Sequence, residues 1–196
     1  MVDAEQTYVQ KAIESVSEQL QERYNKNQAY IIPTIQNYLK RSIERGMYEI
    51  ELAKYRQLKF GAKLVRGAYI VEETKLAKEM KYENPIVDDF DKTTYNYLTN
   101  FRNMVEQVKE GEVVVATHNQ STIEETLVIK SRTENPLTVS FAQLLGLADN
   151  LTWYLKNQNH PVYKYLPWAE TEVMVPYMIR RAQELNQMKY PLDIQY

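Results

Sequence analysis

The 196-residue sequence contains no cysteine and only two histidines, His118 and His160. The absence of cysteine excludes disulfides, a thiolate nucleophile and thiolate metal ligands. Two histidines do not make a histidine-rich metal site, and we predict no metal centre. The longest apolar runs, such as residues 113–116, are far shorter than a membrane-spanning helix requires.

Neither sign of charge is in excess, since 24 Lys and Arg residues face 26 Asp and Glu residues. A surface that binds nucleic acid needs a basic excess, so we expect no nucleic-acid partner. Hydrophobic residues make up 44% and charged residues 26% of the chain, which is typical of a globular protein. The length suits a single domain over residues 1–196. The first five residues resemble neither a signal peptide nor a transit peptide, which leaves the compartment open.

An apolar stripe at helical spacing runs from Val9 to Tyr24 and predicts an amphipathic helix near the N-terminus. Spacing and composition predict further helices at residues 34–58 with a break at Gly46, 72–81, 98–108, 121 onward and 172–188. We expect Gly111 to cap the end of the 98–108 helix. Ser121, with Glu124 three residues later, is expected to cap the start of the helix that follows.

Five short β-rich runs alternate with these helices, at residues 29–32, 62–65, 113–116, 138–141 and 162–165. The alternation contains no hairpin signal, so we predict parallel strands joined by crossover helices. An open doubly wound sheet and a (β/α)8 barrel both fit this order. Polar residues or glycine follow several strands, which favours the barrel, because a barrel places all strand ends on one face. Five strands and a remnant do not close eight, so we expect the chain to be incomplete at its N-terminus.

The segment at residues 63–69 follows a buried strand and reads Lys-Leu-Val-Arg-Gly-Ala-Tyr. Gly67 permits a close approach of the backbone, and Arg66 supplies a fixed cation beside it. Together they would suit an anionic or electron-rich cofactor. The alternative is a glycine turn at a strand end with a solvated arginine, and the residues alone leave both interpretations open.

A second polar segment, Thr117, His118 and Asn119, ends another apolar strand. Its three side chains could form hydrogen bonds with a ligand, and the histidine could also titrate. Alternatively, Asn119 opens the next helix and His118 is a satisfied loop histidine. On its own, this segment favours the structural alternative.

Two charged pairs are also candidates. Arg180 and Arg181 lie in the last predicted helix, where two arginines can bind a carboxylate from two directions, although such a pair is more often solvated. Asp3 and Glu5 could be a general base or metal ligands, although acidic residues near a terminus more often complement a helix N-terminus. The sequence has no nucleophile elbow, GxGxxG or P-loop motif, which argues against a hydrolase or a nucleotide-binding fold.

Taken together, these segments resemble the proline dehydrogenases of the mitochondrial, eukaryotic type. The resemblance begins at residues 2–8 and extends to about residue 184. Six further segments carry it, at residues 28–30, 63–69, 116–119, 141–146, 162–167 and 177–184. Their order is that of the family, which makes the resemblance specific.

The resemblance implies a distorted (β/α)8 barrel that lacks about its first two strands, with non-covalent FAD across the C-terminal ends of the strands. It also implies that L-proline loses a hydride from C5 to flavin N5, which gives Δ1-pyrroline-5-carboxylate, and that electrons pass to a quinone. The location implied is the matrix side of the inner mitochondrial membrane, in peripheral contact with that membrane. A lysine on the family's first strand has no counterpart in this chain.

Individual residues match the family's site positions. Arg180 and Arg181 match the pair that binds the proline carboxylate, and Asp3 matches a strand-end aspartate near the substrate. The side chains that match those enclosing the pyrroline ring are Tyr165, Tyr177, Leu64 and Leu144. The residues that match flavin-contacting positions are Gln28, Lys63, Arg66, Gly67, Ala68, Tyr69, Thr117, His118, Asn119 and Glu184, with Lys63 and Arg66 near the isoalloxazine.

Tyr165 favours proline as the substrate, because related hydroxyproline dehydrogenases have a smaller, hydroxylated residue at this position. Ala142 and Leu147 replace residues that are usually Gly and Met in the family. Leu185 alters the usual Glu-Asn ending at the adenosine end of the FAD site. Two alternatives to a proline dehydrogenase remain: a hydroxyproline dehydrogenase, and a truncated barrel fragment without activity.

Overall fold

The computed structural model describes residues 1–187, and near the C-terminus it describes the side chains as far as Ile179 and that of Arg181. The chain divides into two compact units, Met1–Lys164 and Tyr165–Tyr196. The first unit contains most of the sheet and its helices. The predicted single domain over residues 1–196 stays a prediction.

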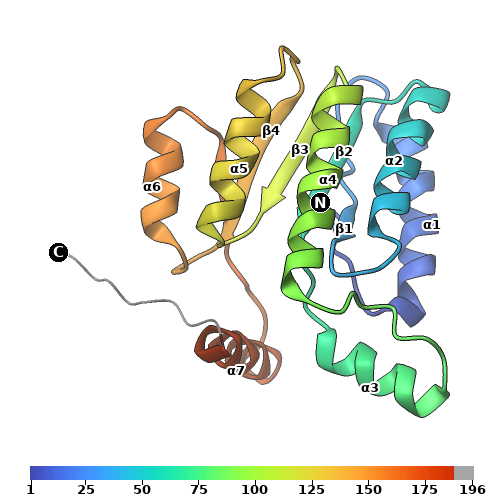
Figure 1. Cartoon of the computed structure of the whole chain (residues 1–196), viewed down its shortest axis with the longest axis vertical. Helices are drawn as coiled ribbons and strands as arrows, with labels where there is room; N and C mark the ends of the chain where they lie inside the picture. Colours follow the sequence, from blue (N-terminus) through green and yellow to red (C-terminus); the bar gives the residue numbers. More distant parts are fainter. Residues whose placement is uncertain (188–196) are drawn as a thin grey trace. The chain divides into compact units, whose positions relative to one another are not determined.

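The first unit is built around a parallel sheet (Figure 1). Its strands are β1 (Thr34–Gln36), β2 (Phe60–Val65), β3 (Gly111–Ala116), β4 (Thr138–Leu144) and β5 (Val162–Tyr165). They lie in the order of the sequence, β1-β2-β3-β4-β5, and the first four pair in parallel. The predicted α/β fold with a parallel sheet is therefore confirmed.

The N-terminal residues extend this sheet beyond β1. Val2 forms a parallel bridge with Pro33, and its N–H donates to the carbonyl of Ile32 at 2.8 Å. On the other side of the bridge, the Thr34 hydroxyl donates to the carbonyl of Val2 at 2.8 Å. These contacts agree with the strand remnant expected from the sequence. Within residues 1–187 the sheet is open and does not close into a barrel.

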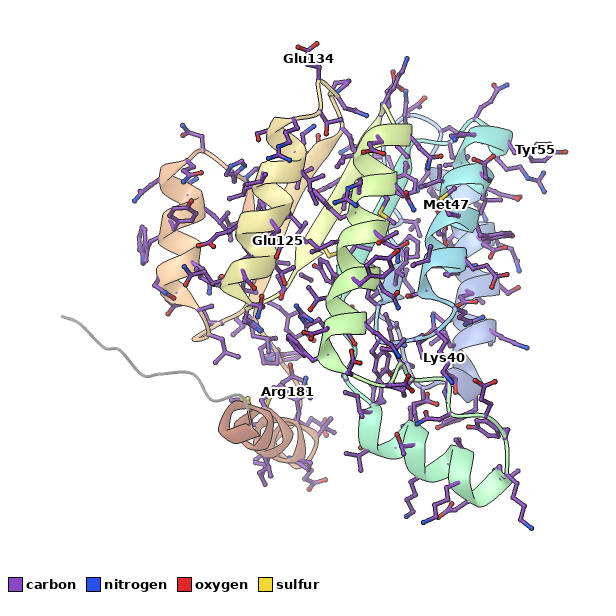
Figure 2. The ribbon with its side chains drawn as sticks, in the orientation of Figure 1. Lys40, Met47, Tyr55, Glu125, Glu134 and Arg181 are labelled. Atoms are coloured by element: carbon purple, nitrogen blue, oxygen red, sulfur yellow. The ribbon has the colours of Figure 1, made fainter. Side chains whose placement is uncertain are left out.

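The helices are α1 (Thr7–Tyr24), α2 (Ser42–Arg56), α3 (Ile70–Met80), α4 (Phe90–Gln107), α5 (Gln120–Ser131), α6 (Asp149–Asn157) and α7 (Thr171–Gln187). In the first unit α2, α4 and α5 lie side by side over one face of the sheet (Figure 1). Tyr55 and Glu134 extend from one end of this layer, and Lys40, which follows β1, lies toward the other end (Figure 2). Among the described helices none is both long and apolar enough to cross a membrane.

The two faces of the sheet carry different side chains, because successive residues of a strand point to opposite faces. One face packs against the helices, and its buried strand residues are Ile35, Phe60, Ala62, Leu64, Val113, Val115, Val139 and Phe141. The other face contains a row of paired residues that crosses four strands, Thr34, Lys63, Val114 and Ser140. Lys63 and Leu64 therefore point to opposite sides of the sheet.

Several predicted boundaries were wrong. The first strand begins after Pro33, at Thr34, because the pairing with β2 starts there: the carbonyl of Pro33 accepts from the N–H of Lys63 at 2.8 Å. Helix α2 passes through Gly46 without a break. A Cβ at this position would lie 2.1 Å from Asn100 Oδ1 of α4. This glycine serves the packing of α2 against α4.

The predicted caps were wrong as well. Helix α4 ends with Val108 as its C-cap, and Gly111 begins β3. A Cβ on Gly111 would lie 1.9 Å from the carbonyl oxygen of Phe60, so this glycine allows the close approach of two strands. The N-cap of α5 is Asn119, whose side chain accepts from the N–H of Thr122, and Ser121 lies inside the helix. Helix α6 was not predicted from the sequence.

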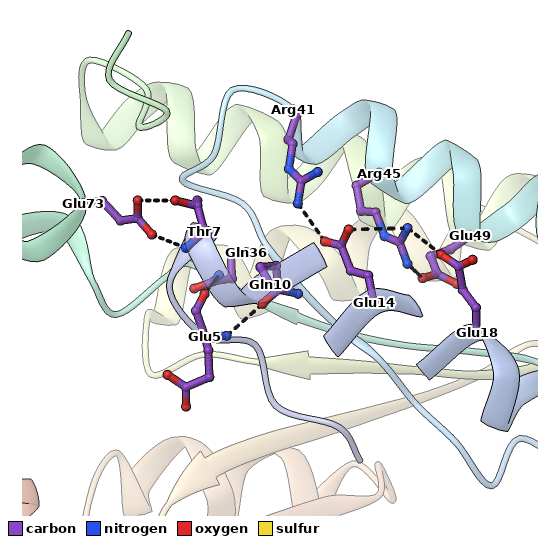
Figure 3. Close-up of polar contacts among 10 residues, drawn as sticks. All are labelled: Glu5, Thr7, Gln10, Glu14, Glu18, Gln36, Arg41, Arg45, Glu49 and Glu73. Atoms are coloured by element: carbon purple, nitrogen blue, oxygen red, sulfur yellow. Dashed lines mark hydrogen bonds and ion pairs between the residues drawn. The ribbon is translucent and has the colours of Figure 1, made fainter. Parts of the chain in front are cut away.

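Helix α1 has the predicted range, but its apolar stripe is largely exposed. The exposed fraction is 37% at Val9 and 56% at Val16, whereas Gln10 and Ser17 are buried. The face of α1 toward α2 is charged. Arg41, the N-cap of α2, binds Glu14 of α1 at 2.8 Å, and Arg45 of α2 binds Glu18 of α1 at 3.1 Å and also pairs with the buried Glu49 (Figure 3).

Candidate active site

Most of the predicted site residues of the first unit gather where β2, β3 and β4 end, together with Asp3 beside β1. Lys63 of β2 forms an ion pair with Asp3, which directly follows the bridge at Val2. The Lys63 side chain is 13% exposed and that of Asp3 is 60% exposed. A largely buried cation is thus held beside a carboxylate that solvent reaches.

Glu5 makes two contacts close to this pair. The hydroxyl of Tyr69 donates to Glu5 Oε2 at 2.5 Å, and Gln36 Nε2 donates to the main-chain carbonyl of Glu5 at 2.9 Å. Gln36 is the last residue of β1 and is 4% exposed. The segment that carries Asp3 and Glu5 is therefore attached to the ends of both β1 and β2.

Gln28, a predicted flavin contact, lies apart from the other candidate residues. Gln28 is exposed and lies six residues before Thr34, between α1 and the start of the strand. Gln36 stands at the carboxyl end of the same strand, where the other candidate residues lie. The sequence contained a signal for it, since Thr34, Ile35 and Gln36 directly follow Pro33, but residues 29–32 are the more apolar run.

Leu64 lies on the opposite face of β2 from Lys63. Its side chain is fully buried in the core between the sheet and the helices. A side chain on that face does not reach a ligand that contacts Lys63, because the two residues alternate along β2. The match to a ring-enclosing position came from the family resemblance, which aligns residues along the sequence and does not show the face on which a side chain lies.

Arg66 points from the end of β2 toward the helices. Its guanidinium donates to Thr94 Oγ1 at 3.0 Å and to Thr122 Oγ1 at 2.7 Å, and it lies 4.1 Å above the ring of Phe90. Thr122 in turn donates through its N–H and hydroxyl to Asn119 Oδ1, both at 2.8 Å. The structure thus brings the Arg66 segment and the Asn119 segment together at the start of α5.

Gly67 has a φ of +137°, a conformation that favours glycine. A Cβ at this position would lie 2.3 Å from the ring of Tyr38, which packs beneath it. Burial raises the pKa of the Tyr38 hydroxyl well above its usual range, and the nearby carboxylate of Glu73 acts in the same direction. Tyr38 therefore stays neutral and supports the turn, which continues into the exposed Ala68 and the half-buried Tyr69.

His118 connects the ends of two neighbouring strands. Its Nε2 accepts a hydrogen bond from the N–H of Leu144 at 2.9 Å, so this nitrogen does not carry the proton. Thr117 is buried, and its hydroxyl accepts from the N–H of Asn119 at 3.1 Å. Asn119 is the N-cap of α5. This agrees with the alternative given for it in the sequence analysis, in which Asn119 opens the next helix.

Leu144 is also held by a residue that the sequence did not indicate. Lys164 of β5 donates to the carbonyl of Leu147 and to Asp149 Oδ1, both at 2.7 Å, and to Gln143 Oε1 at 3.3 Å. Its Nζ also lies 3.5 Å from the carbonyl of Leu144. The loop at residues 143–149 is thereby fixed to β5. A single lysine in a strand gives no signal of such a role.

The remaining candidates belong to the second unit. Tyr165 is the last residue of β5 and is 50% exposed. Tyr177 and Arg181 lie one turn apart on α7, and the guanidinium of Arg181 is 5.1 Å from the centre of the Tyr177 ring. The side chains of Arg180 and Glu184 lie outside the described residues.

The chemistry of these groups is that of binding rather than of a hydrolytic triad or a metal centre. Among the described residues, no cluster of three or more His, Asp and Glu side chains could hold a metal ion. Lys63 supplies a cation and Asp3 a carboxylate, and the start of α5 supplies N–H groups suited to an anion. A ligand that is both negatively charged and long enough to reach from Lys63 to the start of α5 fits these groups.

These features define a parallel α/β protein whose candidate ligand site lies along the carboxyl ends of its strands. The family model for proline dehydrogenase matches residues 1–189. The chain therefore belongs to the proline dehydrogenase family.

Curated relatives agree with this membership. The chain is 38% identical to proline dehydrogenase 1, mitochondrial, of Caenorhabditis elegans and 37% identical to the human protein of that name, over 94% of its length in each case. It is 34% identical to hydroxyproline dehydrogenase of Xenopus laevis, again over 94% of its length. The chain spans 31%, 32% and 41% of these relatives, respectively.

Solved structures support the fold. Proline utilization A from Bdellovibrio bacteriovorus superposes with a TM-score of 0.86 at 24% identity, covering 93% of this chain and 19% of that protein. The Bradyrhizobium japonicum protein gives a TM-score of 0.82 at 23% identity, covering 94% of this chain and 19% of that protein. The sheet and its helices thus have the fold of part of each of these larger proteins.

Proposed function

We propose that this protein takes part in the FAD-dependent oxidation of L-proline to Δ1-pyrroline-5-carboxylate, with a quinone as electron acceptor. The observation that carries the proposal is the convergence of Lys63, Asp3 and Tyr69 at the end of β2 in a chain of this family. The relatives named for this substrate are mitochondrial, and we extend that location, on the matrix side of the inner membrane, to this chain.

The residues present fit FAD. Lys63 offers a shielded positive charge, which favours a ring system that becomes anionic on reduction. The N-terminus of α5, capped by Asn119 and flanked by Arg66 through Thr122, suits the negative charge of a pyrophosphate. Gln36, in place of Gln28, is the amide that we assign to the cofactor at the end of β1.

FAD, when bound, supplies the acceptor for the hydride that leaves the proline ring. In this proposal the protein binds and orients the substrate. Arg180 and Arg181 bind its carboxylate, and Tyr165, Tyr177 and Leu144 enclose its ring. Asp3 holds Lys63 in place, and Thr117, His118 and Glu184 complete the cofactor contacts.

We further propose that the open sheet is an arc of a (β/α)8 barrel. Its strands follow one another in sequence order with helices between them, and the bridge at Val2 continues the same order on the β1 side. A barrel joins all strand ends on one face, which is where the candidate residues of β1 to β4 lie. Closure needs strands beyond the five that residues 1–187 provide.

The test is to purify the protein with FAD and to follow the flavin absorbance on addition of L-proline without oxygen. Bleaching of the flavin by proline supports the function, and a flavin-free aggregate supports the alternative of an inactive fragment with an open sheet edge. Arg181→Ala is expected to weaken proline binding to the flavin-loaded protein at least tenfold. Unchanged binding would show that the carboxylate assignment is wrong.

Hydroxyproline oxidation is the second candidate, because relatives of that name match with similar identity. We favour proline because Tyr165 leaves less room for an added hydroxyl than a small residue would. Turnover of the two amino acids by one preparation separates the candidates. A higher kcat/KM for trans-4-hydroxy-L-proline would reverse the assignment.

A further inference from the structure

Glu73 of α3 is fully buried, and its carboxylate binds the start of α1 (Figure 3). One oxygen accepts from the N–H of Thr7 at 2.5 Å, and the other accepts from the Thr7 hydroxyl at 2.6 Å. Thr7 is the first residue of α1, and its N-cap, Gln6, makes no side-chain capping bond. Glu73 therefore caps α1 from a different helix.

A buried carboxylate is costly unless its environment replaces the water that it loses. Here Glu73 lies near the first turn of α3 and faces the first turn of α1. Both helix ends present N–H groups with partial positive charge, which stabilise an anion. The Glu73 carboxylate thus joins the starts of the two helices.

This contact is the third in a regular series. Asp3, Glu5 and Thr7 alternate along the N-terminal segment, and they contact Lys63, Tyr69 and Glu73, respectively. Gln6, which lies between Glu5 and Thr7, has an extended backbone, and in such a conformation alternate side chains point the same way. The N-terminal segment thus makes one contact each with β2, with the turn after β2 and with α3.

The three contacts differ in strength. Asp3 is 60% exposed, and exposed ion pairs contribute little by themselves because water screens them and the side chains lose freedom. The contact between Glu73 and Thr7 is shielded from water and joins two rigid helices. It therefore adds a buried attachment at the far end of the segment, where the contacts of Val2 and of the Glu5 carbonyl do not reach.

We propose that Glu73 is a positioning residue for the flavin site: through Thr7 it holds Asp3 against Lys63. The proposal rests on the proposed function for its catalytic consequence, while its structural part stands on the contacts alone. Glu73 does not need to contact the substrate or the cofactor. Removal of the Glu73 carboxylate should displace the Lys63 side chain in the same way as removal of the Asp3 carboxylate.

The variants that test this are Glu73→Gln, Thr7→Val and the control Glu72→Gln, which removes an exposed charge from the neighbouring position of α3. Thr7→Ser retains the hydroxyl donor and should restore wild-type behaviour. Hydrogen exchange of the peptide covering residues 2–7, measured by mass spectrometry on the flavin-loaded protein, reports the segment directly. We expect exchange at least ten times faster in Glu73→Gln and Thr7→Val, and unchanged exchange in Glu72→Gln and Thr7→Ser.

The flavin reports the consequence for Lys63. In Glu73→Gln the midpoint potential of the bound flavin should shift in the same direction as in Asp3→Asn, and kcat for proline should fall at least fivefold more than in Glu72→Gln. Unchanged exchange in both Glu73→Gln and Thr7→Val, or a potential that moves in Asp3→Asn only, would overturn the proposal. If wild-type protein fails to oxidise proline, the proposed function fails, while exchange and potential still decide the role of Glu73.

Discussion

The ring of Tyr38 fills the space that a side chain at position 67 would need, 2.3 Å from the ideal Cβ of Gly67. Tyr38 follows β1 and is 1% exposed, so it cannot move aside into solvent. Its N–H donates to the carbonyl of Arg66 at 2.8 Å, which fixes the same turn through the backbone. The turn after β2 is thus built on the end of the neighbouring strand.

Gly67→Ala should therefore destabilise the protein for two reasons, the φ of +137° and the contact with Tyr38. Overpacking of a core contact costs about 1–3 kcal/mol, in addition to the backbone strain. Gly146→Ala is the matched control, because Gly146 also has a positive φ, +81°, but open space at its Cβ. Urea unfolding should show a larger loss of stability for Gly67→Ala than for Gly146→Ala. Equal losses would mean that the Tyr38 ring moves away from the added methyl group.

The pair of Arg45 and Glu49 gives a second prediction. Glu49 is 2% exposed, and Gln21 is its other hydrogen-bond partner, at 3.3 Å. Arg45→Met leaves this carboxylate buried without its cation, which typically costs about 3–5 kcal/mol. Urea unfolding of Arg45→Met should show such a loss at pH 7, whereas Lys54→Met, which breaks the exposed pair with Glu51, should change stability by less than about 1 kcal/mol.

The double variant Arg45→Met with Glu49→Leu distinguishes a lost attraction from an unpaired charge. Removal of both groups takes away the buried carboxylate along with its partner. We expect the double variant to recover most of the stability that the single variant loses. A double variant as unstable as Arg45→Met would instead indicate that the packing of the arginine stem matters most.

The same site predicts a pH dependence. Burial raises the pKa of Glu49, although Arg45 opposes the rise. A carboxyl group with a raised pKa contributes most to stability at low pH, where it is neutral in both states, and this contribution is lost as the pH rises through the folded-state pKa. The deficit of Arg45→Met, which lacks the opposing cation, should therefore be largest at neutral pH and should shrink as the pH falls toward 4. Urea unfolding at several pH values measures it, and a deficit that grows with acidity would contradict the assignment.

The strand ends were predictable because their signal is local. An apolar, β-branched run followed by polar residues identifies β2 with Lys63 and Arg66, and β3 with Thr117 to Asn119. A parallel sheet then brings such ends to one edge without further information. The pairing of Lys63 with Asp3 was outside this reasoning, since it depends on how the N-terminal segment lies beside β1.

Two predictions, the buried face of α1 and the position of the first strand, failed for the same physical reason. The hydrophobic pattern of a segment does not show which other segment packs against it. The apolar stripe of α1 predicted the helix correctly, yet the charged side with Glu14 and Glu18 is the one that meets α2. Likewise, residues 29–32 are more apolar than Thr34–Gln36, but only the latter pair with β2. Tertiary partners decided both cases, and one sequence does not contain them.

Lys164 provides the last prediction, because its ammonium group holds three acceptors of the loop at residues 143–149. Lys164→Met keeps much of the apolar stem but leaves the carbonyl of Leu147 and the carboxylate of Asp149 without this donor. The loop should then move more freely, and with it Leu144, which we place beside the substrate ring. We expect amide exchange of residues 144–149 to be at least tenfold faster, and KM for proline to rise about tenfold with a smaller change in kcat. Lys156→Met on the exposed side of α6 is the control and should change neither quantity. Faster exchange with an unchanged KM would remove Leu144 from the substrate pocket, whereas unchanged exchange would show that Lys164 does not hold the loop.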